Sequence, residues 1–314
     1  TRRSFLLQSG VLVAAAATGC QRERAPVFVP TARRAVTQRL DGMPTTDGAG
    51  VRLLRVIGQP ALRNLDPFLM LDRFHSDDPN AWIQGFPDHP HRGFETVTVM
   101  LAGRMRHRDS RGNSGLIQGG GAQWMTAARG IIHSEMPEQE RGLMSGFQLW
   151  VNLPAKEKLG PVAYQDLQPQ QLAEDKLSPA GSRVRVIAGN ANGLLGPVRQ
   201  RPTQPTVLTL ALEDDRPFEL DTPHEHTAFA FVSSGEVELG PEDGATRVAE
   251  GTLAILGPGD RLRVRATNQR SELLLASARP LREPIVQRGP FVMNSEEEIR
   301  QAFADYRAGL LDKG

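Results

Sequence analysis

The chain has 314 residues, which is enough for two domains of ordinary size. Its 37 basic and 36 acidic residues nearly cancel, so no overall field favours nucleic acid or an anionic membrane surface, and we expect no nucleic-acid partner. Aromatic residues make up only 5%, whereas 31 glycines and 23 prolines are typical of short strands joined by tight turns. This balance favours a β-rich fold.

Residues 1–20 have the pattern of an export signal. Arg2 and Arg3 precede an apolar run that ends in small residues before Cys20. This order resembles a bacterial twin-arginine signal, and Cys20 stands where a lipoprotein signal places its acylated residue. We therefore expect export to the periplasmic or cell-envelope face, with membrane contact only through a lipid on Cys20. The alternative is a short helix that packs on the folded body, and the run is too short for a transmembrane helix.

Residues 21–35 contain two prolines and no sustained hydrophobic period, so we expect a tether. Residues 36–165 then form the first predicted barrel, because β-rich runs in this range are separated by turn signals. The expected strands include residues 37–40, 51–56, 94–101, 116–118 and 146–151.

A second barrel is predicted for residues 180–288, which contain a further series of β-rich runs of similar spacing. Its expected strands include residues 207–212, 228–232, 236–239, 253–256 and 273–278. The remaining residues, 289–314, form a tail with one helix. There Ser295 and Glu298 make a capping box, and Ile299, Phe303 and Tyr306 follow at helical spacing, which indicates packing on a barrel.

The pattern that carries chemistry is a set of histidines and glutamates in the first barrel. His89 and His91 stand two residues apart, as do His133 and Glu135. Residues i and i+2 of a strand share one face, so each pair can point into one cavity, and Glu95 joins them if its strand is unbroken. Histidines in such positions can also hydrogen-bond loops, but the full set predicts a mononuclear metal site.

Three blocks around these residues resemble the pirin family of the cupin superfamily. They are residues 86–98, 123–137 and 149–154, and the resemblance covers roughly residues 36–310. It implies an all-β fold of two tandem cupin barrels (double-stranded β-helices) with one C-terminal helix, and a metal in the first barrel only.

The resemblance also implies a ligand set and a metal. It points to Glu135 as the fourth ligand beside His89, His91 and His133, whereas ordinary cupins use the glutamate that is Glu95 here. Glu95 is then expected to orient a ligand or accept a proton. The family implies Fe(II), and nitrogen and carboxylate ligands also suit Zn, Mn, Ni or Cu.

Several other residues are given ordinary roles. His224 and His226 echo the first site, but Ala230 stands where a glutamate would follow, so we expect no complete second site. His107 is expected on the surface between charged neighbours, with a place at the cavity mouth as the alternative. Trp124 and Met125 are expected in the core, as are Phe68, Phe74, Phe86 and Phe94. The basic clusters at residues 33–34 and 261–265 are expected on solvated strands.

The function implied by the resemblance is that of a quercetinase-type dioxygenase. Its substrates would be a flavonol or a related enediol aromatic together with dioxygen, and Glu135 or Glu95 would act as base. Two alternatives remain: a non-catalytic, redox-responsive iron-binding module that contacts other proteins, and a metal-dependent isomerase or hydrolase. The sequence leaves the substrate, the native metal and the oligomeric state open.

Overall fold

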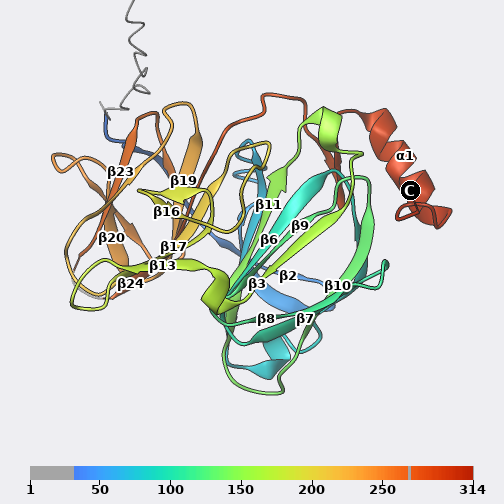
Figure 1. Ribbon diagram of the computed structural model, residues 1–314, viewed down its shortest axis with the longest axis horizontal. Coiled ribbons are helices and arrows are strands. Elements are labelled where there is room, and N and C mark those ends of the chain that lie inside the picture. Colours follow the sequence, from blue (N-terminus) through green and yellow to red (C-terminus); the bar gives the residue numbers. More distant parts are fainter. Residues whose placement is uncertain (1–31, 268–269, 314) are drawn as a thin grey trace, which may run out of the picture.

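The computed structural model describes residues 32–267 and 270–313. The predicted export signal and most of the predicted tether lie outside these residues. Figure 1 shows two β-barrels side by side, with the helix α1 (Glu296–Arg307) at the outer edge of the first. The prediction of an all-β protein with two barrels and one C-terminal helix is confirmed. Within the described residues no helix is long and apolar enough to cross a membrane.

The first barrel consists of two antiparallel sheets. Its seven-stranded sheet contains, in spatial order, β12 (Ala163–Leu167), β9 (Ala122–Thr126), β6 (Phe94–Ala102), β11 (Met144–Asn152), β4 (Phe68–Ser76), β3 (Val51–Ile57) and β2 (Met43–Asp47). Its four-stranded sheet contains β5 (Phe86–His91), β10 (Ile131–Pro137), β7 (Arg104–Asp109) and β8 (Ser114–Gln118).

The second barrel repeats this arrangement. Its seven-stranded sheet contains β1 (Val36–Asp41), β22 (Thr252–Leu256), β19 (Thr227–Ser234), β24 (Ser271–Ala278), β17 (Thr206–Leu212), β14 (Arg183–Ala188) and β13 (Ala173–Lys176). Its four-stranded sheet contains β18 (Phe218–Asp221), β23 (Arg261–Ala266), β20 (Glu236–Leu239) and β21 (Thr246–Ala249). Apolar side chains from both sheets form its core.

Short elements join these sheets. They are the 3-10 helices η1 (Pro79–Ala81), η2 (Ala155–Glu157) and η3 (Pro169–Gln171), and the two-stranded pairs β15 (Asn190–Ala191) with β16 (Leu194–Leu195) and β25 (Val286–Arg288) with β26 (Phe291–Met293).

The predicted boundaries of the barrels need correction at two strands. The strand β1 pairs with β22, so the first strand of the described chain belongs to the second barrel, although we expected the first barrel to begin at residue 36. The first barrel begins instead with β2. The strand β13 pairs with β14, so the second barrel resumes before residue 180. The pairing of β1 has no local sequence signal, because β1 and β22 lie far apart in the sequence, whereas β13 and β14 are consecutive strands.

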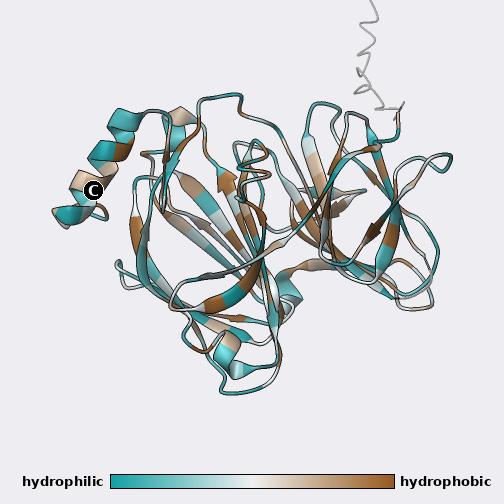
Figure 2. Cartoon of the chain, turned by 180° about the vertical axis from the view of Figure 1, so that it is seen from behind, coloured by the Kyte–Doolittle hydropathy of each residue, from teal (hydrophilic) through white to brown (hydrophobic). Residues whose placement is uncertain are grey.

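The two barrels pack through the outer faces of their seven-stranded sheets. One continuous apolar cluster contains residues of both sheets, including Val97, Phe147 and Leu149 from the first and Phe229, Phe231 and Leu274 from the second. The rings of Phe147 and Phe231 meet edge to face with their centroids 6.0 Å apart. Figure 2 shows apolar stretches along strands of both barrels. The barrels therefore share a core rather than a polar interface.

A buried ion pair crosses the edge of this core. Glu95 on β6 is completely buried, and its Oε1 accepts hydrogen bonds from the hydroxyl of Thr126, at 2.7 Å, and from the guanidinium of Arg201 in the second barrel. Burial raises the pKa of Glu95, whereas the positive charge of Arg201 opposes that rise. The ion pair thus offsets the free energy that the carboxylate of Glu95 loses when burial removes it from water.

We expect Arg201→Met to lower the free energy of unfolding by about 3 kcal/mol, because it leaves a buried carboxylate without its cation. Removing both partners in Glu95→Met with Arg201→Met should restore most of that loss. Urea unfolding followed by circular dichroism measures the free energy of unfolding of the single and the double variant. Arg199→Met is the matched control, since Arg199 lies exposed on the same loop. Equal losses for the single and double variants would contradict this account.

Candidate metal centre

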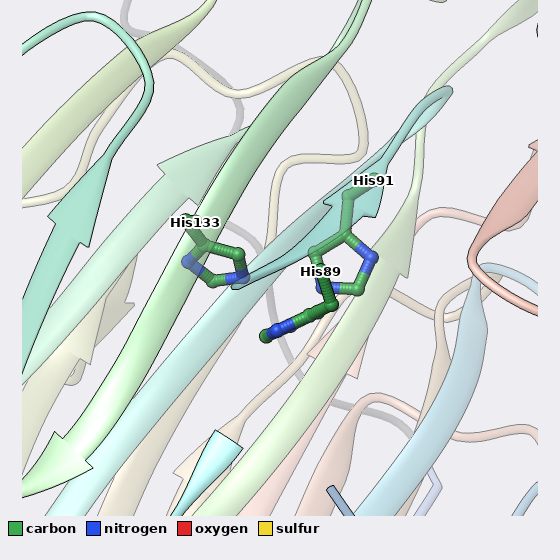
Figure 3. A group of neighbouring side chains, drawn as sticks. All are labelled: His89, His91 and His133. Carbon is green, nitrogen blue, oxygen red and sulfur yellow. The ribbon is translucent and has the colours of Figure 1, made fainter. Parts of the chain in front are cut away.

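Three histidines of the first barrel lie together on two neighbouring strands. His89 and His91 are on β5, and His133 is on β10, directly opposite His89 in the strand pairing. One nitrogen from each ring lies within 4.8 Å of the others. Figure 3 shows the three imidazoles gathered in one group. The two-residue spacing of His89 and His91 predicted that they share one face of a strand, and the pairing with β10 brings His133 to them.

The hydrogen bonding of these rings suits a metal ion. Nδ1 of His91 and both ring nitrogens of His133 are buried and have no hydrogen-bond partner among the described residues. Burial, followed by the neighbouring imidazoles, lowers the pKa of His91 and of His133 well below the usual value, so both rings are neutral and keep their lone pairs. A neutral imidazole is the form that coordinates metals.

A hydrogen bond fixes His89 in the tautomer that carries its proton on Nδ1. Its Nδ1 lies 2.8 Å from the carbonyl oxygen of Pro87, so Nδ1 carries the proton and donates it to that oxygen. The lone pair of Nε2 is then free for a metal, in the arrangement that ligating histidines commonly use.

Glu135 lies on the same face of β10 as His133, but it is held by two neutral side chains. The hydroxyl of Thr98 lies 2.9 Å from its Oε1, and the amide of Gln148 donates to its Oε2 at 2.9 Å. The cluster of possible metal ligands in the described residues comprises the three histidines, and Glu135 stands beside it. Its role as fourth ligand remains a prediction.

The structure places Glu95 away from the histidines. Gly93, with φ of 93°, lies between the end of β5 and the start of β6, so the chain turns there instead of continuing as one strand. Glu95 and Thr98 then fall on opposite faces of β6, and Glu95 faces Thr126 and Arg201. The expected role of Glu95 beside the metal is therefore not supported. Thr98 and Gln148 are the polar neighbours that sequence reasoning missed, and the alternation of threonine and valine in β6 was the available signal for Thr98.

We expected His107 on the surface, but its side chain is buried and the residue is only 1% exposed. It lies on β7 opposite Glu135, with its ring centroid 6.4 Å from that of His133 and 4.8 Å from that of Tyr164. Its charged neighbours Arg106 and Arg108 alternate to the other face of the strand. The prediction failed because it considered the neighbours rather than the period of the strand.

The histidines of the second barrel have separate partners. Nδ1 of His224 lies 3.2 Å from Asp260, and Nδ1 of His226 lies 3.3 Å from the hydroxyl of Ser277. Burial, followed by the charge of Arg34, lowers the pKa of His226 to about 4.

The expectation that Arg34 is solvated is wrong. Its guanidinium is buried and donates to the hydroxyl of Thr222 and to the carbonyls of Gly257 and Pro223. Burial lowers the pKa of Arg34 to about 10.

A cavity of about 600 Å³ opens beside the histidine cluster. His89 and His91 line it together with Glu135, Thr98 and Gln148. Its apolar wall comprises Leu53, Met70, Phe74, Phe86, Met105 and Trp150, so Phe74 and Phe86 serve the cavity as well as the core. A largely apolar cavity with a few polar groups is the usual form of a small-molecule site.

The chain matches known proteins along most of its length. Family models described as pirin and as pirin C-terminal cupin domain match residues 50–151 and 207–312. A Pseudomonas aeruginosa protein named "Putative quercetin 2,3-dioxygenase" is 49% identical over 286 residues, which are 90% of this chain and 99% of that protein. Human pirin is 43% identical over 264 residues, which are 83% of this chain and 88% of pirin.

A solved structure shows the same fold. The crystal structure of quercetin 2,3-dioxygenase from Acinetobacter baumannii superposes with a TM-score of 0.82 and 32% sequence identity, covering 88% of this chain and 98% of that chain. With both of its barrels matched by the family models, the chain belongs to the pirin family of cupin proteins.

Proposed function

We propose that this pirin is a metal-dependent dioxygenase that acts on quercetin-like flavonols or related enediol aromatics, with Fe(II) as its metal. The observation that carries the proposal is the set of nitrogens on His91 and His133 that have no hydrogen-bond partner in the described part of the chain. They lie beside a cavity large enough for an aromatic ligand. The names of the Pseudomonas and Acinetobacter relatives support the same reaction class.

The donor set favours a first-row divalent ion. Three imidazole nitrogens and the carboxylate of Glu135 would hold Fe(II), and they would also suit Mn, Ni, Cu or Zn. Glu135 supports this assignment because it is 2% exposed and pairs with no arginine or lysine among the described residues. When bound, the metal supplies Lewis acidity toward the substrate hydroxyl and a meeting point for substrate and dioxygen.

The residues around the cavity would prepare the substrate. The carboxylate of Glu135 would accept the proton of the substrate hydroxyl, since its orientation is fixed by Thr98 and Gln148. Phe74 and Phe86 would cover the aromatic rings and exclude water. Holding the reactants in one small space replaces a collision with a positioned encounter.

The reaction predicts oxygen uptake. Anaerobic, iron-loaded protein should bind quercetin and consume dioxygen when air is admitted. His133→Ala should lower the rate at least about 100-fold, because even changes outside the ligand shell cost 10 to 100-fold. An oxygen electrode measures the rate. His224→Ala, in the second barrel, is the control and should keep it. Bound iron without flavonol-dependent uptake would contradict the dioxygenase and favour a metal-binding interaction module.

The two glutamates predict different metal affinities. Glu135→Gln should raise the dissociation constant of the metal by about 10 to 100-fold, since it weakens a ligand or its immediate support. Glu95→Gln should leave that constant within about threefold, because Glu95 faces Arg201. Metal content after competition with a chelator measures both. If Glu95→Gln strips the metal and Glu135→Gln retains it, the site follows the ordinary cupin pattern.

We also propose export through residues 1–20 with acylation of Cys20. The support is the paired arginines, the apolar run and the small residues before the cysteine. In a bacterium with a twin-arginine system, mass spectrometry of the membrane fraction should find an N-terminus at acylated Cys20. Cys20→Ser should remove the lipid. A cytosolic product that retains residues 1–19 would contradict the proposal.

A further inference from the structure

A row of polar side chains crosses the inner face of the seven-stranded sheet in the first barrel. The strand pairings place Arg55 opposite Asp72, Asp72 opposite Gln148, and Gln148 opposite Thr98. Residues that pair directly project from the same face of a sheet. All four line the cavity, and Gln148 and Thr98 also contact Glu135. The row therefore connects the side of the histidines to the far side of the cavity.

Arg55 at the far end of this row is held in a fixed orientation. Its Nε donates to Oδ1 of Asp72 at 2.9 Å, and its Nη2 donates to Oδ2 of Asp72 and to Asp47, each at 2.7 Å. Such a bidentate pair fixes the plane of the guanidinium. Nη1 makes no hydrogen bond to any described residue, and the side chain is 21% exposed. Two N–H donors on a rigid group are thus left for water or a ligand.

The charges in the cavity restrict the ligand. Asp47, Asp72, Asp88 and Glu135 line it, and Arg55 is the cation among the lining residues. An excess of carboxylates repels an anionic ligand. A hydroxyl group suits this end of the cavity, because it can accept from Nη1 of Arg55 and donate to a neighbouring carboxylate.

The length of the row fits an aromatic molecule with polar groups at both ends. Neighbouring strands lie about 4.8 Å apart, so the backbone at Arg55 lies roughly 14 Å, or three strand spacings, from that at Thr98. The long side chain of Arg55 shortens this span. A planar ligand with one oxygen group at the histidines can therefore bring a second one, on its far ring, to Arg55.

We propose that Arg55, held by Asp72 and Asp47, determines specificity by binding a hydroxyl group on the far ring of a neutral aromatic substrate. This inference rests on the proposed function, since it places the other end of the ligand at the histidines. The substrates preferred by the cavity are then flavonols whose far ring is a catechol, over flavonols whose far ring carries no hydroxyl.

The test compares two flavonols in binding, without turnover. Quercetin carries a catechol as its far ring, whereas galangin shares the fused rings and their hydroxyls but has none on the far ring. Both are titrated anaerobically into the metal-loaded full chain while tryptophan fluorescence is followed, because Trp150 lines the cavity. We expect quercetin to bind about tenfold more tightly, as for one hydrogen bond to a charged group.

Arg55→Lys keeps the positive charge beside Asp72 but removes the planar group and its Nη1 donors. It should bring the ratio of the two dissociation constants close to one. Arg52→Lys is the matched control, because Arg52 lies on the same strand with its side chain exposed, and it should keep the ratio. Circular dichroism and metal content report that each variant is folded and loaded.

The outcomes separate this inference from the proposed function. Equal binding of the two flavonols by the unaltered protein, or a ratio that Arg55→Lys leaves intact, would overturn the role of Arg55 and make the ion pair purely structural. Dioxygen uptake with quercetin would then still support the dioxygenase. Failure of both flavonols to bind would overturn the proposed function and this inference together.

Discussion

The site depends on the close approach of two backbones at Gly93. This glycine follows the His89 to His91 strand, and a side chain there would place its Cβ only 1.9 Å from the carbonyl oxygen of Val292. The buried amine of Lys158 donates to the carbonyls of Gly93 and Val292, at 2.6 and 3.0 Å. Burial lowers the pKa of Lys158 to about 7. A small residue and a buried amine thus fix the corner after the histidine strand.

This corner brings a C-terminal segment of the chain against the first barrel. Val292 belongs to β26, which follows the second barrel in the sequence. Arg92, next to His91, donates to Asp305 of α1 at 2.6 Å and lowers the pKa of that carboxyl. The C-terminal segment therefore supports the histidine strand from outside.

The parts of the structure that were predictable from sequence are those with a local period. Alternating residues indicated the strands, the capping box at Ser295 indicated α1, and the paired spacing of the histidines indicated their shared face. The parts that failed depend on distant contacts or on which face a strand presents. Nothing local shows that β1 crosses to the second barrel, or that Arg34 is buried by loops almost 190 residues away.

Glu95 and Glu135 show how the face of a strand decides the chemistry of a residue. Both carboxylates are buried, yet the charge of Glu95 is matched by Arg201, while the described residues that donate to Glu135 are the neutral side chains of Thr98 and Gln148. A buried carboxylate without a cation is costly, and a metal ion on the neighbouring histidines would offset that cost. Glu95 has no such need, because the charge of Arg201 already compensates it. Glu135, which pairs with no cation among the described residues, is therefore the carboxylate to which we assign the proposed chemistry.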